Sequence, residues 1–97
     1  MSDILDVTVP DYPIRRENII AEELEGMDEV IFIDPETGDN YAMNNMAAVI
    51  LELCDGKHSA EDMSRIIQET LAGDFERIHK DVLAMLTEFS AFNLIHG

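Results

Sequence analysis

An α+β fold is predicted by three observations. Residues typical of strands are concentrated between Ile19 and Met43, a helical spacing of apolar residues runs from Asn44 to Phe89, and the connections are short. With 97 residues, the chain is long enough for one domain with one core and too short for two. Hydrophobic residues make up 46% of it, which is ordinary for a folded protein.

The first half of the chain predicts a lead-in followed by three strands. Residues 1–13 form the lead-in, in which two prolines favour an extended backbone, and residues 14–97 form the domain. The expected strands are Ile19–Glu25, Glu29–Asp34 and Asn40–Met43.

A tight turn is expected between the second and third strands. Asp34-Pro35-Glu36-Thr37-Gly38 places proline at the second position of a type I turn and glycine where a positive φ follows. The third strand is short, and we expect it at a sheet edge.

The first two predicted helices have caps that can be read from the sequence. Asn44 or Asn45 caps the first, and Gly56 ends it in a left-handed conformation. Ser59 and Asp62 form a capping box for the second, which stops at Gly73. The expected inward residues are Ala47, Ile50, Leu51 and Cys54 in the first helix, and Met63, Ile66, Ile67 and Leu71 in the second.

A third helix is predicted to begin after its cap, Asp74. Its apolar stripe is Phe75, Ile78, Val82, Leu86 and Phe89. Asn93–Gly97 is a tail that could add a last short strand. A three-stranded antiparallel sheet followed by three helices is a winged helix-turn-helix-like arrangement.

The charge of the chain argues against the usual partner of such a fold. Six Lys and Arg face 21 Asp and Glu, so the net charge is −15. A DNA duplex would repel this surface, and anionic membranes would too. No secretory signal, transit peptide or long apolar run is found, which favours a cytoplasmic protein.

The residues needed for catalysis are missing from the sequence. No phosphate-binding glycine loop is present, the three histidines lack metal-site spacing, and Cys54 is the only cysteine. Ser59 is expected to be used as a helix cap, and Cys54 to pack in the core rather than react. We therefore expect neither enzymatic activity nor a metal or other cofactor.

One segment resembles the PqqD family. Met43–Asp62 contains the features typical of that family in their order. A strand ends in an apolar residue followed by Asn, and a helix with small residues comes next. The segment Leu53-Cys54-Asp55-Gly56 and a Ser/Thr helix cap then follow. The likeness extends over residues 14 to 95. The chain differs from the family mainly in its acidity and in its first 13 residues.

The resemblance implies a function in peptide recognition. Such proteins bind the leader of a ribosomally made precursor peptide, which adds as a strand to the third strand and lies against the third helix. They present the precursor to a partner enzyme, such as a radical SAM protein or a leader peptidase. An exposed edge strand can pair in this way because its backbone groups are free.

A candidate peptide-binding site follows from this implied role. The apolar residues of the third helix spread too widely to face one direction, so some should line a groove beside the third strand. The expected site is Asn40, Tyr41, Ala42, Met43, Ile78, Val82, Met85 and Leu86. The alternative is that the sheet and the tail cover all of the helix residues.

Other functions remain open at this stage. An acidic carrier protein would be similarly small and negative, but no serine has the Asp-Ser-Leu context of an attachment site. An acidic protein-interaction module, including a mimic of nucleic acid, is a further alternative.

Overall fold

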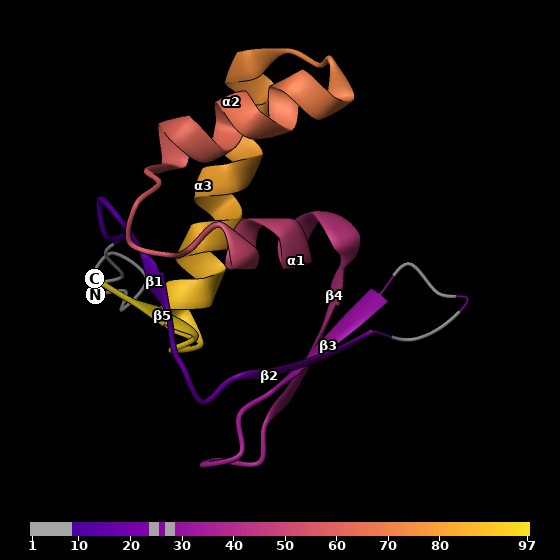
Figure 1. Cartoon of the computed structure of the whole chain (residues 1–97), viewed down its shortest axis with the longest axis vertical. Coiled ribbons are helices and arrows are strands. Elements are labelled where there is room, and N and C mark those ends of the chain that lie inside the picture. Colours follow the sequence, from indigo (N-terminus) through magenta and orange to yellow (C-terminus); the bar gives the residue numbers. More distant parts are fainter. Residues whose placement is uncertain (1–8, 24–25, 27–28) are drawn as a thin grey trace, which may run out of the picture.

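The computed structural model describes residues 9–23, 26 and 29–97, and it has the predicted α+β architecture (Figure 1). The main sheet is antiparallel with strand order β2-β3-β4. Its strands are β2 Ile20–Glu23, β3 Glu29–Ile33 and β4 Asn40–Asn44. The helices that follow are α1 Asn45–Glu52, α2 Ala60–Leu71 and α3 Phe75–Ala91. A second, two-stranded sheet pairs β1 Ile14–Arg15 with β5 Ile95–His96.

The β3–β4 hairpin closes as the sequence predicts. Gly38 has a φ of +80°, and its N–H donates to the Asp34 C=O at 2.7 Å. The Asp34 side chain accepts from the Glu36 N–H at 3.0 Å, which fixes the turn further. At the other end of the sheet, β2 stops at Glu23, and the expected strand residues Leu24 and Glu25 lie outside the described residues.

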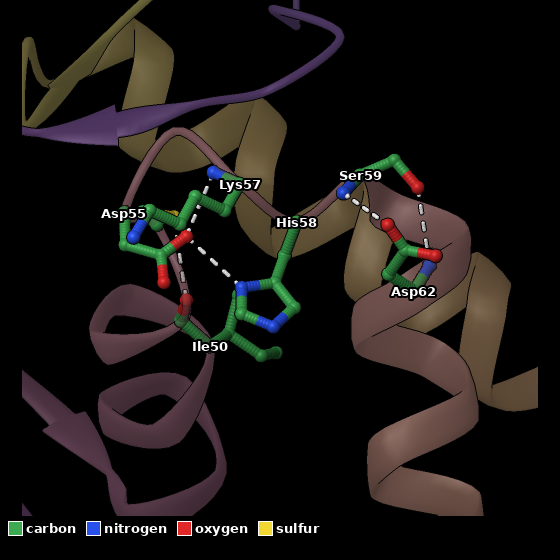
Figure 2. A network of polar contacts seen from close by, with 7 residues as sticks. Ile50, Asp55, Lys57, His58, Ser59 and Asp62 are labelled. Atoms are coloured by element: carbon green, nitrogen blue, oxygen red, sulfur yellow. Dashed lines mark hydrogen bonds and ion pairs between the residues drawn. The ribbon is translucent and has the colours of Figure 1, made fainter.

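The predicted caps of α1 and α2 are confirmed. The Asn44 side chain accepts from the Ala47 N–H at 2.9 Å. Ser59 and Asp62 exchange both bonds of a capping box, at 3.0 and 3.1 Å (Figure 2). Asp74 is the N-cap of α3, but its side chain makes no capping bond.

Both predicted helix ends need correction. Helix α1 ends at Glu52, and the positive φ of Gly56 occurs later, in the connection to α2. Helix α2 ends at Leu71, two residues before Gly73, and its C-cap Ala72 takes the left-handed conformation, with a φ of 52°. The Ala72 N–H donates to the Gln68 C=O at 2.7 Å, so a backbone bond stabilises this conformation.

The core lies between the three helices and one face of the sheet. Its buried residues are Ile19, Val30, Phe32, Ala47, Ile50, Leu51, Cys54, Met63, Ile67, Val82, Leu86, Phe89, Leu94 and Ile95. Leu71 was expected among them, but it is 55% exposed, because the last turn of α2 extends beyond the region that the core fills.

Helix α3 is the longest element and connects the two ends of the molecule. Figure 1 shows it extending from α2, past α1, to β5. The described part of the lead-in packs onto this end: Pro13 is buried, and its C=O accepts from the Gly56 N–H at 3.0 Å. The expected boundary between the lead-in and the domain lies at residue 14, but Pro13 of the lead-in already packs on the domain.

Candidate functional site

Strand β4 is an edge of the main sheet, and its free backbone groups can be identified. The Asp34 N–H donates to the Asp39 C=O, so these two residues form a hydrogen-bonded pair. Counted from this pair, every second pair of facing residues in the hairpin is hydrogen-bonded. Tyr41 and Met43 therefore bond to β3. Asn40 and Ala42 direct their N–H and C=O groups away from the sheet, where no described strand pairs with them.

The side chains of β4 alternate between two faces. Tyr41 and Met43 are half-buried and pair with Phe32 and Val30, so they lie on the core side of the sheet. Asn40, Ala42 and Asn44 are exposed. A peptide residue that pairs opposite Tyr41 or Met43 would point its own side chain toward the same side.

Helix α3 runs alongside β4 in the opposite direction and leaves a hollow between them. This first hollow has a volume of about 450 Å³. It is lined by Asn40, Tyr41, Ala42, Met43, Asn44, Ala47, Met85, Glu88 and Phe92. The Tyr41 and Phe92 rings stack across one end, with centroids 4.9 Å apart and planes at 24°.

A second hollow of about 310 Å³ adjoins the first and shares Asn44 and Met85 with it. Its other lining residues are Met46, Ile50, Ile78, Asp81, Val82 and Ala84. We call the two hollows together the β4–α3 groove. The groove offers a strand edge on one side and an apolar helix face on the other.

The structure brings seven of the eight predicted site residues to this groove. Asn40, Tyr41, Ala42 and Met43 lie along the strand, Ile78 and Val82 lie in the second hollow, and Met85 lies in both. Leu86 is 0% exposed and belongs to the core, so it supports the groove from behind without lining it.

Eight groove residues were missing from the predicted site: Asn44, Met46, Ala47, Ile50, Asp81, Ala84, Glu88 and Phe92. Phe92 follows Met85 by seven residues, which is the helical signal that could have found it. The predicted apolar stripe ended at Phe89, whereas α3 extends to Ala91 and Phe92 is its C-cap.

Tyr41 contributes a hydroxyl group to the groove as well as a ring. The Tyr41 hydroxyl donates to the Asp39 carboxylate at 3.4 Å. Partial burial, reinforced by the negative charge of Asp39, raises the pKa of the Tyr41 phenol. Tyr41 is therefore a neutral hydrogen-bonding group at neutral pH.

The residues with the chemistry for catalysis are engaged elsewhere. Burial raises the pKa of the Cys54 thiol to about 12, and its Sγ donates to the Ile50 C=O at 3.3 Å. Figure 2 shows His58 turned toward Asp55, with Nδ1 and the carboxylate 2.9 Å apart, and Ser59 turned toward Asp62. Ser59 and His58, although adjacent in sequence, thus belong to two different contacts.

No group of three or more His, Cys, Asp or Glu in the described part of the chain could hold a metal ion. None of the described helices has the length and apolar character needed to cross a membrane.

Three solved structures share this fold. "Lasso peptide synthetase B1 complexed with the leader peptide" is 16% identical, with a TM-score of 0.74 over 89% of this chain and 99% of that one. TbiB1 in complex with the TbiA(beta) leader peptide is 17% identical, with a TM-score of 0.72 over 87% of this chain and 95% of that one.

The third structure is the PqqD truncation of Methylobacterium extorquens PqqCD, described as a functional and stand-alone recognition element for ribosomally synthesised, post-translationally modified peptides. It is 19% identical, with a TM-score of 0.78 over 99% of this chain and 100% of that one. No curated protein matches the chain. The family model for coenzyme PQQ synthesis protein D matches residues 29–95, more than half of the chain. The chain therefore belongs to the PqqD family.

Proposed function

We propose that this chain binds the leader of a ribosomally made precursor peptide by strand addition to β4 and presents it to a modifying enzyme. The observation that carries the proposal is the free edge of β4 beside the β4–α3 groove. The backbone groups of Ala42 supply hydrogen bonds and orientation, and the groove accepts the side chains opposite Tyr41 and Met43. Two structures of the same fold contain a leader peptide, which supports this use of the fold.

The chain acts in this proposal without chemistry of its own. Cys54 is buried, and Ser59 is engaged in a helix cap, so neither provides a nucleophile. The modification is made by the partner, which we expect to be a radical SAM protein or a leader peptidase. Binding to this chain raises the local concentration of the leader beside that enzyme.

The proposal is tested by titrating the isotope-labelled full chain with the leader of its precursor peptide and following the backbone amide signals. The expected shifts occur in residues 40–45 and 78–92, on the two walls of the groove. A peptide with the same composition in scrambled order is the control. Shifts confined to residues 60–71, with both walls unchanged, would exclude this binding mode.

A further inference from the structure

The charged residues that line the β4–α3 groove are of one sign. Asp81 lines the second hollow and Glu88 the first, and no Lys, Arg or His lines either. Both carboxylates are on exposed residues, and neither pairs with a cation among the described residues. The groove therefore presents two negative charges that are free for a ligand.

The two carboxylates lie toward opposite ends of the groove. They are seven residues apart on α3, which is two helical turns or roughly 10.5 Å along the axis. Glu88 shares the first hollow with Tyr41 and Phe92, and Asp81 shares the second with Met46. Met85, which lines both hollows, lies between them, so an apolar centre is flanked by acidic ends.

An extended peptide can place side chains along this pattern. Residues two apart on one face of a strand are about 6.8 Å apart. Two side chains opposite Tyr41 and Met43 would enter the apolar centre. The residues that flank this pair on the same face would be about 20 Å apart, so each would lie about 5 Å beyond Asp81 or Glu88 along the groove. Long cationic side chains suit these ends, because their apolar stems pack while their charges reach a carboxylate.

No described Lys, Arg or His lines the groove, so no cation in its lining would favour an acidic peptide. Arg15 donates to the Ile19 C=O, Arg16 to Asn93, and Arg65 lies near Glu61 on α2. Arg77 and Lys80 precede Asp81 on α3, but neither makes an ion pair with it. An acidic residue at either end of the bound peptide would meet a like charge at the edge of an apolar surface.

We infer that Asp81 and Glu88 select a leader with paired apolar residues, flanked on the same face by Lys or Arg. This inference rests on the proposed function and assigns the substrate class of that same site. Because the whole chain carries a charge of −15, it attracts any cationic peptide over long distances. The local contribution of the two groove carboxylates must therefore be separated from that general attraction.

The test is a selection of short random-sequence peptides displayed on phage against the purified full chain. The enriched peptides are synthesised, and their binding is measured to the unchanged chain and to two double variants. Asp81→Asn with Glu88→Gln removes the groove charges. Glu69→Gln with Glu76→Gln removes two charges from exposed residues that do not line the groove, and so matches the change in net charge.

The expected peptides carry Lys or Arg beside an apolar pair and shift the amide signal of Ala42. The groove variant weakens them about tenfold, as expected for two partly screened ion pairs, and the matched control by less than about twofold. Enrichment of neutral or acidic peptides at β4, or equal weakening by both variants, would overturn the charge selection and leave the proposed function intact. Peptides that bind away from β4, or no enriched peptide at all, would overturn both.

Discussion

The main sheet has two edges, β4 and β2, to which no described strand is paired, and they differ in their surroundings. Ala21 and Glu23 of β2 direct their backbone groups outward, as Ala42 does on β4, because Glu22 and Ile20 are the residues that bond to β3. All four β2 residues are exposed, however, and β2 makes its main contacts with β3 alone.

A free sheet edge is not by itself a binding site. Both strands can offer hydrogen bonds, but only β4 lies beside a helix face that can accept side chains. On β2, Glu22 and Glu23 place charges beside the free groups, which discourages pairing with another strand. We therefore expect substitutions on the two edges to have different effects on peptide binding.

The largest difference is expected from proline on each edge. Ala42→Pro removes the outward N–H of β4 and places a ring where the peptide would pair, so leader affinity should fall by about tenfold or more. Ala21→Pro makes the same change on β2 and should alter affinity by less than about twofold. Proline is tolerated at both positions because the lost N–H faces outward.

Calorimetric titration of the leader into each variant measures the effect, and far-UV circular dichroism checks that both fold. A greater loss for Ala21→Pro would reverse the comparison and place the peptide on β2.

The helix wall of the groove is tested by a charge on each side of α3. Met85 is half-buried and lines both hollows, whereas Leu83 is 39% exposed and lies on another side of the helix, beside Ser59 and Ala60. Met85→Glu should weaken leader binding roughly tenfold, because a charge would then face the apolar anchors of the peptide. Leu83→Glu should leave binding nearly unchanged.

The same titrations serve here, with the urea midpoint of each variant as the check on folding. Equal leader affinities for the Met85 and Leu83 variants would mean that α3 does not contribute to the site and that the leader binds to the edge of β4 alone.

The contact between strand and helix distinguishes β4 from β2 even without a peptide. Tyr41 stacks on Phe92, whereas Ile20 of β2 is 49% exposed and has no such ring partner. A double-mutant cycle of Tyr41→Ala and Phe92→Ala should give a coupling of about 0.5–1.5 kcal/mol in the free energy of unfolding. The matched cycle of Ile20→Ala and Phe92→Ala should give a coupling close to zero.

Urea unfolding of the four chains in each cycle provides these values. A coupling near zero for Tyr41 and Phe92 would mean that the stacked rings contribute nothing to holding the end of the groove.

Much of this comparison could be predicted from sequence, because local rules apply to it. The periodicity from Ala47 to Phe89 predicted the helices, and Asp34–Gly38 predicted the hairpin that leaves β4 at an edge. Seven of the expected site residues reach the groove for the same reason: alternation on a strand and spacing on a helix fix which side chains share a face.

The remaining features depend on contacts distant in sequence. The pairing of β1 with β5 joins residues at opposite ends of the chain, and two-residue strands have no periodicity to detect. Leu71 fits the α2 stripe, yet tertiary packing leaves it exposed. The burial of Leu86 behind the groove, and the position of Phe92 opposite Tyr41, follow from how α3 lies on the sheet.

A smaller effect is expected from a substitution of Cys54. This substitution tests whether the loss of core packing alone can lower leader affinity. Cys54→Ala should lower the free energy of unfolding by about 1 kcal/mol and leave leader affinity unchanged, because Cys54 is buried away from both edges. With a thiol pKa of about 12, the native protein should react slowly with thiol reagents near neutral pH.

Urea unfolding and the rate of labelling by a thiol reagent provide the two measurements. Labelling as fast as that of a free cysteine would contradict burial, and weaker leader binding would show that core packing reaches the groove.

The smallest effect is expected on stability in acid. It comes from two carboxylates at the connection between α1 and α2, which belong to neither β2 nor β4. The His58 hydrogen bond and the Lys57 N–H lower the pKa of Asp55, and the Ser59 N–H, with the Ser59 side chain, lowers that of Asp62 (Figure 2). Folded pKa values below the unfolded value, about 3.9 for Asp, mean that the native state binds fewer protons. Their contribution to stability is present above that pH and is lost as the pH falls through the folded pKa values.

Asp62→Asn should therefore make the loss of stability in acid shallower, as measured by urea midpoints over a series of pH values. Glu69→Gln is the matched control, since Glu69 is exposed on the same helix and its side chain makes no hydrogen bond to the described residues. Above the range in which Asp62 titrates, leader affinity should be the same for both variants, because the capping box lies outside the β4–α3 groove. An acid dependence as steep for Asp62→Asn as for the unchanged chain would show that the cap carries no charge-dependent stability. A loss of leader affinity in Asp62→Asn alone would show that leader binding at β4 depends on the first turn of α2. The difference between β4 and β2 would then depend on the helices as well as on the two strands.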